Sequence, residues 1–168
     1  QTTIVFMPWT GTSTNSGLYS YFMQNLDSIE GAIKKAGSMS NRVVVFLSTS
    51  SSESELYEIT LVNKQIQHTT IKNYSGNLYT TADGIAQILN DVKSNAFALN
   101  YSMIIGCHGS GWTYKDDWNN YPYAAKLQTS NYAAKSTIRS QEATYHPTRF
   151  YGSVNDISNY GTDIETLQ

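Results

Sequence analysis

The sequence contains a single cysteine, Cys107, so no disulfide can form within its 168 residues. A domain without disulfides has to be stabilised by its own hydrophobic core. Charged residues are also scarce: they make up 14% of the chain, and the formal net charge is −2. The chain therefore has no strongly basic field, which argues against a nucleic-acid partner and against binding to anionic lipid.

Long hydrophobic segments are absent as well. No apolar run approaches the roughly 20 residues that a membrane-spanning helix needs, and the first residues lack a signal-peptide pattern. Thirteen tyrosines and three tryptophans accompany many Ser, Thr and Asn residues, a composition that favours a secreted or cell-surface protein. At this length we expect one domain over residues 1–168.

Three segments are predicted to be buried strands. Thr2–Met7, Val43–Leu47 and Met103–Gly106 are short runs that are apolar at nearly every position. Runs of this kind are typical of strands with both faces covered, as in the centre of a parallel sheet.

Two helices and a hairpin are predicted between these strands. Apolar residues recur at steps of three and four from Leu18 to Ile33, with Gly37 as a stop, and again over Thr81–Ala98, with Thr81 as the cap. Two segments of alternating polarity, 55–62 and 65–74, are separated by Asn63 and Lys64, which predicts a β-hairpin.

The order of these elements predicts an α/β fold. Right-handed crossovers place helices on both faces of a mostly parallel sheet, and the hairpin extends that sheet. Ligands collect beyond the carboxyl ends of the strands in such folds, and His108 follows one of these ends.

The region after the third strand has no clear periodicity. Residues 113–151 are rich in Tyr, Asn, Ser, Ala and Thr and include Lys126, Lys135 and Arg139. A loop of this length in a compact domain is usually functional or disordered. Thr162 and Glu165 have the spacing of a capping box and predict a helix start near the end of the sequence.

The segment "HGSGW", 108–112, contains the residues best suited to a catalytic role. An imidazole at the end of a strand is held by the sheet while its ring faces solvent, a suitable position for a general base near neutral pH. Gly109 has no side chain, so its N–H can approach a substrate oxygen as in an oxyanion hole. The simpler interpretation is a turn in which the histidine caps or packs.

The same segment resembles the signature of the clostripain-like cysteine peptidases, family C11 of the caspase-fold clan. In that signature His-Gly is followed by Ser or Gly, then Gly and Trp, and the segment Thr148–Asp156, "TRFYGSVND", also resembles the family. The resemblance implies a caspase-like three-layer sandwich and a bacterial cysteine endopeptidase acting on proteins or peptides after Arg or Lys. It implies that His108 is catalytic, that Gly109 contributes to the oxyanion hole, and that Ser110 and Trp112 line the site.

The nucleophile of such enzymes is a cysteine after the next strand, usually in the triplet Asp-Ala-Cys, which is absent here. Cys107 is a poor substitute because adjacent strand residues point to opposite faces. We expect its thiol to be inert, under a covering helix. The nucleophile is therefore expected outside these residues, in a heavy chain or C-terminal remainder of the same precursor, and residues 1–168 are expected to be an N-terminal or light-chain portion.

The resemblance also implies autoprocessing after Lys or Arg in the loop, with Lys126, Lys135 and Arg139 as candidate sites. The chain runs through all three and ends in Gln168, so either this loop is not the processing site or the boundary at residue 168 is made in another way. No cofactor is required by this chemistry. Calcium remains possible because related enzymes can depend on it and Asp116 and Asp117 offer oxygen ligands. No grouping of His, Cys, Asp or Glu has zinc spacing.

Two other functions compete with the peptidase assignment. A serine esterase requires a Gly-x-Ser-x-Gly elbow, and the sequence has none. A non-catalytic binding module of the caspase fold, on the cell surface, agrees with the many Tyr and Trp residues. A cysteine after a buried strand in the downstream part would distinguish the peptidase from the binding module.

Overall fold

A five-stranded sheet forms the centre of the protein, in the order β4-β3-β2-β1-β5. The computed structural model describes residues 1–11, 18–109, 113–114, 147–153 and 160–167. Within them, no helix is both long and apolar enough to cross a membrane.

Three parallel strands and an antiparallel hairpin make up this sheet. β1 (Thr2–Met7) lies between β2 (Arg42–Ser48) and β5 (Tyr101–Ile105) and is parallel to both. The hairpin of β3 (Glu53–Val62) and β4 (Gln65–Ser75) continues the sheet beyond β2. Its turn residues, Asn63 and Lys64, both have positive φ, as a type I′ turn requires, which confirms the predicted hairpin.

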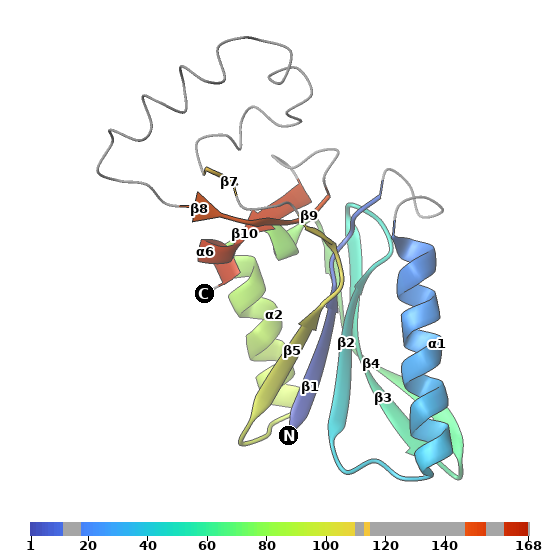
Figure 1. Ribbon diagram of the computed structural model, residues 1–168. Helices are drawn as coiled ribbons and strands as arrows, with labels where there is room; N and C mark the ends of the chain where they lie inside the picture. The colour runs from blue at the N-terminus through green and yellow to red at the C-terminus, as the bar shows by residue number, and fades with distance from the viewer. Residues whose placement is uncertain (12–17, 110–112, 115–146, 154–159, 168) are drawn as a thin grey trace, which may run out of the picture.

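The two long helices cover opposite faces of the sheet (Figure 1). α1 (Tyr19–Ala36) buries Phe22 and Leu26 against β1, β2 and β3, and α2 (Ala82–Asn95) buries Ile85, Ile88 and Val92 on the other face. The short 3-10 helix η1 (Leu78–Thr80) precedes α2. This arrangement of helix, sheet and helix confirms the predicted α/β sandwich.

The ends of the helices follow local chemistry. The Thr81 side chain accepts a hydrogen bond from the N–H of Gly84, as predicted for the cap of α2, and Gly37 ends α1 with φ +72°. The predicted extent of the second helix is too long, because α2 ends at Asn95 and Phe97 is 65% exposed. Ala96 leaves the helical conformation, and its carbonyl accepts a hydrogen bond from the Thr2 hydroxyl at 2.8 Å.

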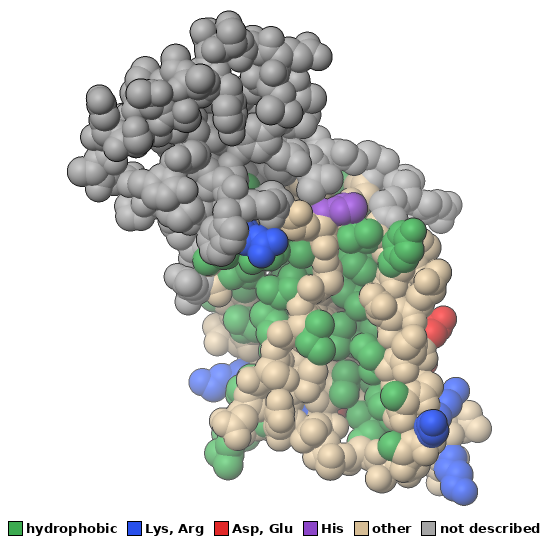
Figure 2. All heavy atoms as spheres, viewed as in Figure 1, with side chains coloured by type: hydrophobic (Ala, Val, Ile, Leu, Met, Phe, Trp, Pro, Cys, Tyr) green, Lys and Arg blue, Asp and Glu red, His purple; other side chains and the backbone are tan. Residues whose placement is uncertain are grey.

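The third predicted strand is not buried on both faces. β5 is at one edge of the sheet, and Ile104, which pairs with Val5 of β1, is 57% exposed. α1 packs mainly on β1, β2 and β3, so this face of β5 stays uncovered within the described residues. Figure 2 shows hydrophobic side chains gathered on the face of the sheet seen in that view.

A smaller sheet lies at the carboxyl ends of the parallel strands (Figure 1). Its order is β10-β9-β6, formed by Gly161–Asp163, Phe150–Gly152 and His108–Gly109. β7 (Thr113–Tyr114) and β8 (Pro147–Thr148) form a separate antiparallel pair. The Trp9 ring, after β1, packs edge-on against Tyr160 with 5.0 Å between centroids, and so connects the smaller sheet to the larger one.

The predicted capping box is wrong. α6 (Ile164–Leu167) is capped by Asp163, whose Oδ1 accepts hydrogen bonds from the Thr166 N–H at 2.8 Å and the Thr166 hydroxyl at 2.7 Å. Thr162 is buried within β10, and its hydroxyl has no hydrogen-bond partner among the described residues. Residues 161–163 pair with β9, so the helix begins after this strand.

Candidate functional site

The candidate site follows the C-terminal end of β5, on the side of the sheet where the parallel strands end. The N–H of Gly106 donates to the carbonyl of Phe6 at 2.9 Å, which extends the pairing with β1 by one residue. A Cβ at Gly106 would lie 3.3 Å from Cε1 of Phe22 and 3.4 Å from Cγ of Met7. The backbone is therefore closely packed where it leaves the sheet, directly before Cys107 and His108.

His108 is held by backbone pairing with β9. In the antiparallel β6–β9 pair, His108 lies opposite Gly152 and Gly109 lies opposite Tyr151. His108 is half-buried, whereas Gly109 is exposed, and a Cβ at Gly109 would have no atom of the described residues within 4 Å. The site thus combines a restrained histidine backbone with open space beside the following glycine.

Gly152 occupies a position that no other residue fits. Its φ is +105°, and a Cβ there would lie 2.6 Å from the carbonyl oxygen of Tyr160 and 3.2 Å from Cα of Gly161. The same Tyr160 oxygen accepts a hydrogen bond from the N–H of Ser153 at 3.1 Å. The absent side chain lets β9 and β10 approach each other beside His108.

The Cys107 thiol is half-buried. Burial raises the pKa of this thiol, and a backbone hydrogen bond from Gly152 partly offsets the rise. A thiol with a raised pKa is mainly protonated at neutral pH, which makes it a weak nucleophile. The thiol thus contacts the backbone of β9.

Several predicted residues lie outside the described part of the chain. They are the site-lining Ser110 and Trp112, the candidate processing sites Lys126, Lys135 and Arg139, and the candidate calcium ligands Asp116 and Asp117. Within the described residues, no group of three or more His, Cys, Asp or Glu side chains is placed to hold a metal ion.

Two features near His108 were missed by sequence reasoning. The first is the role of Gly152, because its contact with residue 160 depends on tertiary structure. The second is a set of buried hydroxyls that have no partner in residues 1–11, 18–109, 113–114, 147–153 and 160–167, namely those of Thr10, Ser153 and Thr162. Hydroxyl residues in such segments are ordinarily solvated, so no sequence signal marked them.

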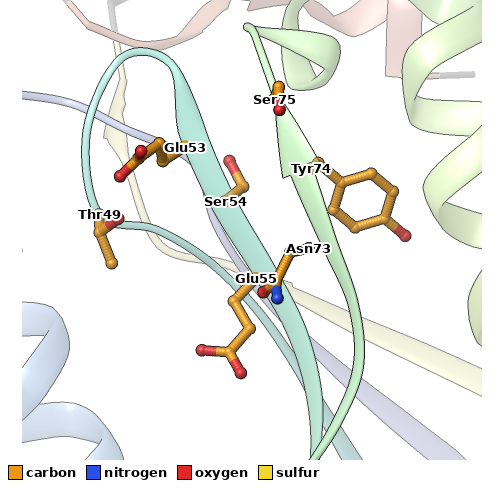
Figure 3. Close-up of a pocket in the computed structure, with 7 residues that line it drawn as sticks. All are labelled: Thr49, Glu53, Ser54, Glu55, Asn73, Tyr74 and Ser75. Carbon is orange, nitrogen blue, oxygen red and sulfur yellow. The ribbon is translucent and has the colours of Figure 1, made fainter.

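A separate hollow of about 300 Å³ lies on the hairpin (Figure 3). Glu53 and Glu55 lie on one side of the hairpin and the Tyr74 ring points to the other. Glu55 Oε1 accepts a hydrogen bond from the Thr70 hydroxyl at 2.6 Å. None of the predicted catalytic residues lines it; the lining residues are Thr49, Glu53, Ser54, Glu55, Asn73, Tyr74 and Ser75.

Comparisons with known proteins give matches among solved structures only. No protein-family model matches the chain, and no curated protein matches it in sequence. A clostripain from Bacteroides thetaiotaomicron, solved with the peptide inhibitor BTN-VLTK-AOMK, is 38% identical. The match covers 67% of this chain and 93% of that one, with a TM-score of 0.61.

Two further structures extend the similarity. A secreted C11 cysteine protease of the same species, "iotapain", is 31% identical, with a TM-score of 0.74. That match covers 99% of this chain, which spans only 40% of the protease chain. An inactive zymogen C11 protease from Parabacteroides distasonis, 20% identical with a TM-score of 0.57 over 70% of this chain and 33% of that one, supports the fold alone. With 38% identity over nearly the whole of the first relative, the chain belongs to the clostripain, or C11, family of cysteine proteases.

Proposed function

We propose that the complete protein is a cysteine endopeptidase that cleaves after arginine or lysine and uses His108 as its catalytic base. The observation that carries the proposal is the position of His108: it follows β5 at the carboxyl edge of the sheet, and β9 holds its backbone. Membership of the cysteine protease family supports this assignment.

In the proposed reaction, the His108 imidazole accepts the proton of a cysteine thiol, and the thiolate attacks the carbonyl carbon of the scissile bond. The N–H of Gly109 donates a hydrogen bond to the oxyanion that forms. When the C–N bond breaks, the imidazolium gives its proton to the leaving amine. Water then attacks the thioester, which releases the new carboxyl group and restores the thiol. Ser110 and Trp112 are proposed to line the entrance.

The nucleophile is proposed to come from outside residues 1–168, in the remainder of the same precursor. Two observations support this. β5 has β1 on one side and no strand on the other among the described residues, and the chain spans 40% of the iotapain chain. The precursor is proposed to be cut after Lys126, Lys135 or Arg139, which would divide residues 1–168 between two associated chains of one caspase-like domain, completed by the downstream segment.

Specificity for a basic residue is supported by one relative. The inhibitor in complex with the clostripain is BTN-VLTK-AOMK, in which K directly precedes the AOMK group. We extend that preference to this protein at the residue before the scissile bond. Secretion by a bacterium is proposed because iotapain is described as secreted. The chemistry requires no cofactor, and calcium binding through Asp116 and Asp117 stays a prediction.

The test is to replace His108 with Ala in the complete protein. General-base catalysis contributes about 10²–10⁴-fold to rate, so we expect kcat for Arg-amide and Lys-amide peptides to fall by at least about 10²-fold. Leu-amide peptides should be poor substrates of the wild type. Cys107→Ser is the matched control, and it should keep both turnover and sensitivity to thiol alkylation.

Undiminished hydrolysis by the His108→Ala variant would contradict the proposal. Loss of hydrolysis in Cys107→Ser, together with loss of alkylation, would show that the nucleophile is Cys107. The binding-module alternative predicts no thiol-dependent hydrolysis in the wild type.

A further inference from the structure

We infer that Gly152 is a positioning residue for His108, which it holds in place through the smaller sheet. The inference rests on the proposed function because it assigns His108 a catalytic role. Its geometric part, the dependence of the imidazole position on Gly152, is independent of that role.

The first step concerns how His108 is attached. β6 contains only His108 and Gly109, and β9 is its neighbour in the described sheet. The residue opposite His108 in this pairing is Gly152. Gly152 also makes the backbone hydrogen bond to the Cys107 thiol. One glycine therefore contacts two consecutive residues at the end of β5.

The second step concerns which strand moves when Gly152 gains a side chain. A Cβ would lie 2.6 Å from the Tyr160 oxygen and has to move beyond 3.0 Å, a displacement of at least 0.4 Å. Tyr160 is anchored, because its ring packs on the buried Trp9. Gly109, by contrast, is exposed with open space around it. We therefore expect β9 and β6 to be displaced, and His108 to move with them.

The third step concerns the effect on the reaction. Catalytic groups are sensitive to displacement, and about 1 Å of misplacement can cost about 10²-fold in rate. A displacement of several tenths of an ångström at His108 should lower kcat. Substrate binding depends on other contacts, so KM should change little.

The experiment compares Gly152→Ala with Gly76→Ala in the complete protein. Gly76 is a matched control because it also has positive φ, +83°, but a Cβ there would meet no atom within 4 Å. Both variants carry backbone strain, and only Gly152→Ala carries the contact with Tyr160. We expect kcat to fall about 10-fold or more in Gly152→Ala, with KM within about twofold, while Gly76→Ala keeps kcat at equal folded fraction.

A second measurement does not depend on activity. The imidazole Cε1–H resonances of the protein are recorded by NMR, and the signal of His108 is identified by its loss in His108→Ala. Gly152→Ala should shift this signal, and Gly76→Ala should leave it in place.

An unmoved His108 signal in Gly152→Ala, or equal kcat in the two glycine variants, would overturn the inference. Failure of the proposed function looks different: His108→Ala would keep full turnover, whatever the NMR signal does in Gly152→Ala. The two ideas can therefore fail separately.

Discussion

The two sheets of this protein are stabilised in different ways. The five-stranded sheet buries large apolar side chains on both faces, and Val44, Phe46 and Ile59 have no exposed surface. The three-stranded sheet that carries His108 has one large buried apolar side chain among its described residues, Phe150, and is otherwise organised by backbone pairing around Gly152. The scaffold thus has a deep core, whereas the candidate catalytic residue belongs to a region with few apolar contacts. Regions of that kind open at lower free energy than the core.

The largest expected effect comes from the core of the five-stranded sheet. Phe46 is fully buried and stacks on Phe6 with 4.8 Å between ring centroids. Phe46→Ala removes the ring and leaves a cavity, so we expect the free energy of unfolding to fall by about 3–5 kcal/mol, measured by urea denaturation. Val62→Ala is the control, because Val62 is 42% exposed and its truncation should cost less than about 1 kcal/mol. Equal losses would contradict the assignment of the core.

A medium effect distinguishes buried hydroxyls in the two sheets. The Thr2 hydroxyl donates to the Ala96 carbonyl, whereas the Thr162 hydroxyl, also buried, has no partner within the part of the chain that the structure describes. Thr2→Val should lower the free energy of unfolding by about 1–2 kcal/mol. Thr162→Val should be neutral or stabilising, since it removes an unsatisfied polar group. Thermal denaturation of both variants checks the difference, and a larger loss in Thr162→Val would show that this hydroxyl has a role.

The smallest effect is a dependence on pH. Burial alone raises the pKa of Asp91, but hydrogen bonds from Lys72 and Tyr74, both 2.8 Å, outweigh it and lower the pKa below the ordinary value. A carboxyl group with a lowered folded-state pKa stabilises the fold above its unfolded pKa, about 3.9. That stabilisation is lost as the pH falls through the lower, folded value.

Asp91→Asn should therefore flatten the acid side of the stability curve, below about pH 5. Asp91 joins α2 to β4 and is partly exposed, so we expect a loss of less than about 1 kcal/mol at pH 7. Urea denaturation at several pH values measures this change. The NMR signal of His108 should be unaffected, since Asp91 joins α2 to the larger sheet whereas His108 belongs to the smaller one; an altered signal would show that the two regions are coupled.

The sequence predicted the parts of the fold that depend on local pattern. Thr81 caps its helix, Gly37 ends the first helix, and the residue pair Asn63–Lys64 turns the hairpin. Each of these features depends on a single turn of the backbone and on the side chains within it. Residues close in sequence were therefore sufficient to predict it. The predicted fold class followed from the order of these elements.

The predictions were wrong where contacts between residues distant in sequence determine the structure. Ile104 has the apolar character of a buried strand, but its exposure depends on the neighbour of β5 and on how far α1 extends across the sheet. Strands of two or three residues, such as β6 and β10, are too short for periodicity to reveal. Because β10 cannot be recognised from the sequence, the capping-box pattern places the cap at Thr162, whereas Asp163 at the end of β10 caps the last helix. His108 could be singled out by its sequence context, whereas its pairing with Gly152 could not.

The edge-on packing of Trp9 against Tyr160 has a practical consequence. Trp9 is 9% exposed and lies where the smaller sheet meets the larger one. An indole shielded from water emits at shorter wavelength than a solvated one. With Trp112 and Trp118 replaced by Phe, its fluorescence becomes an optical reporter of whether the smaller sheet has separated from the larger one while the core remains intact.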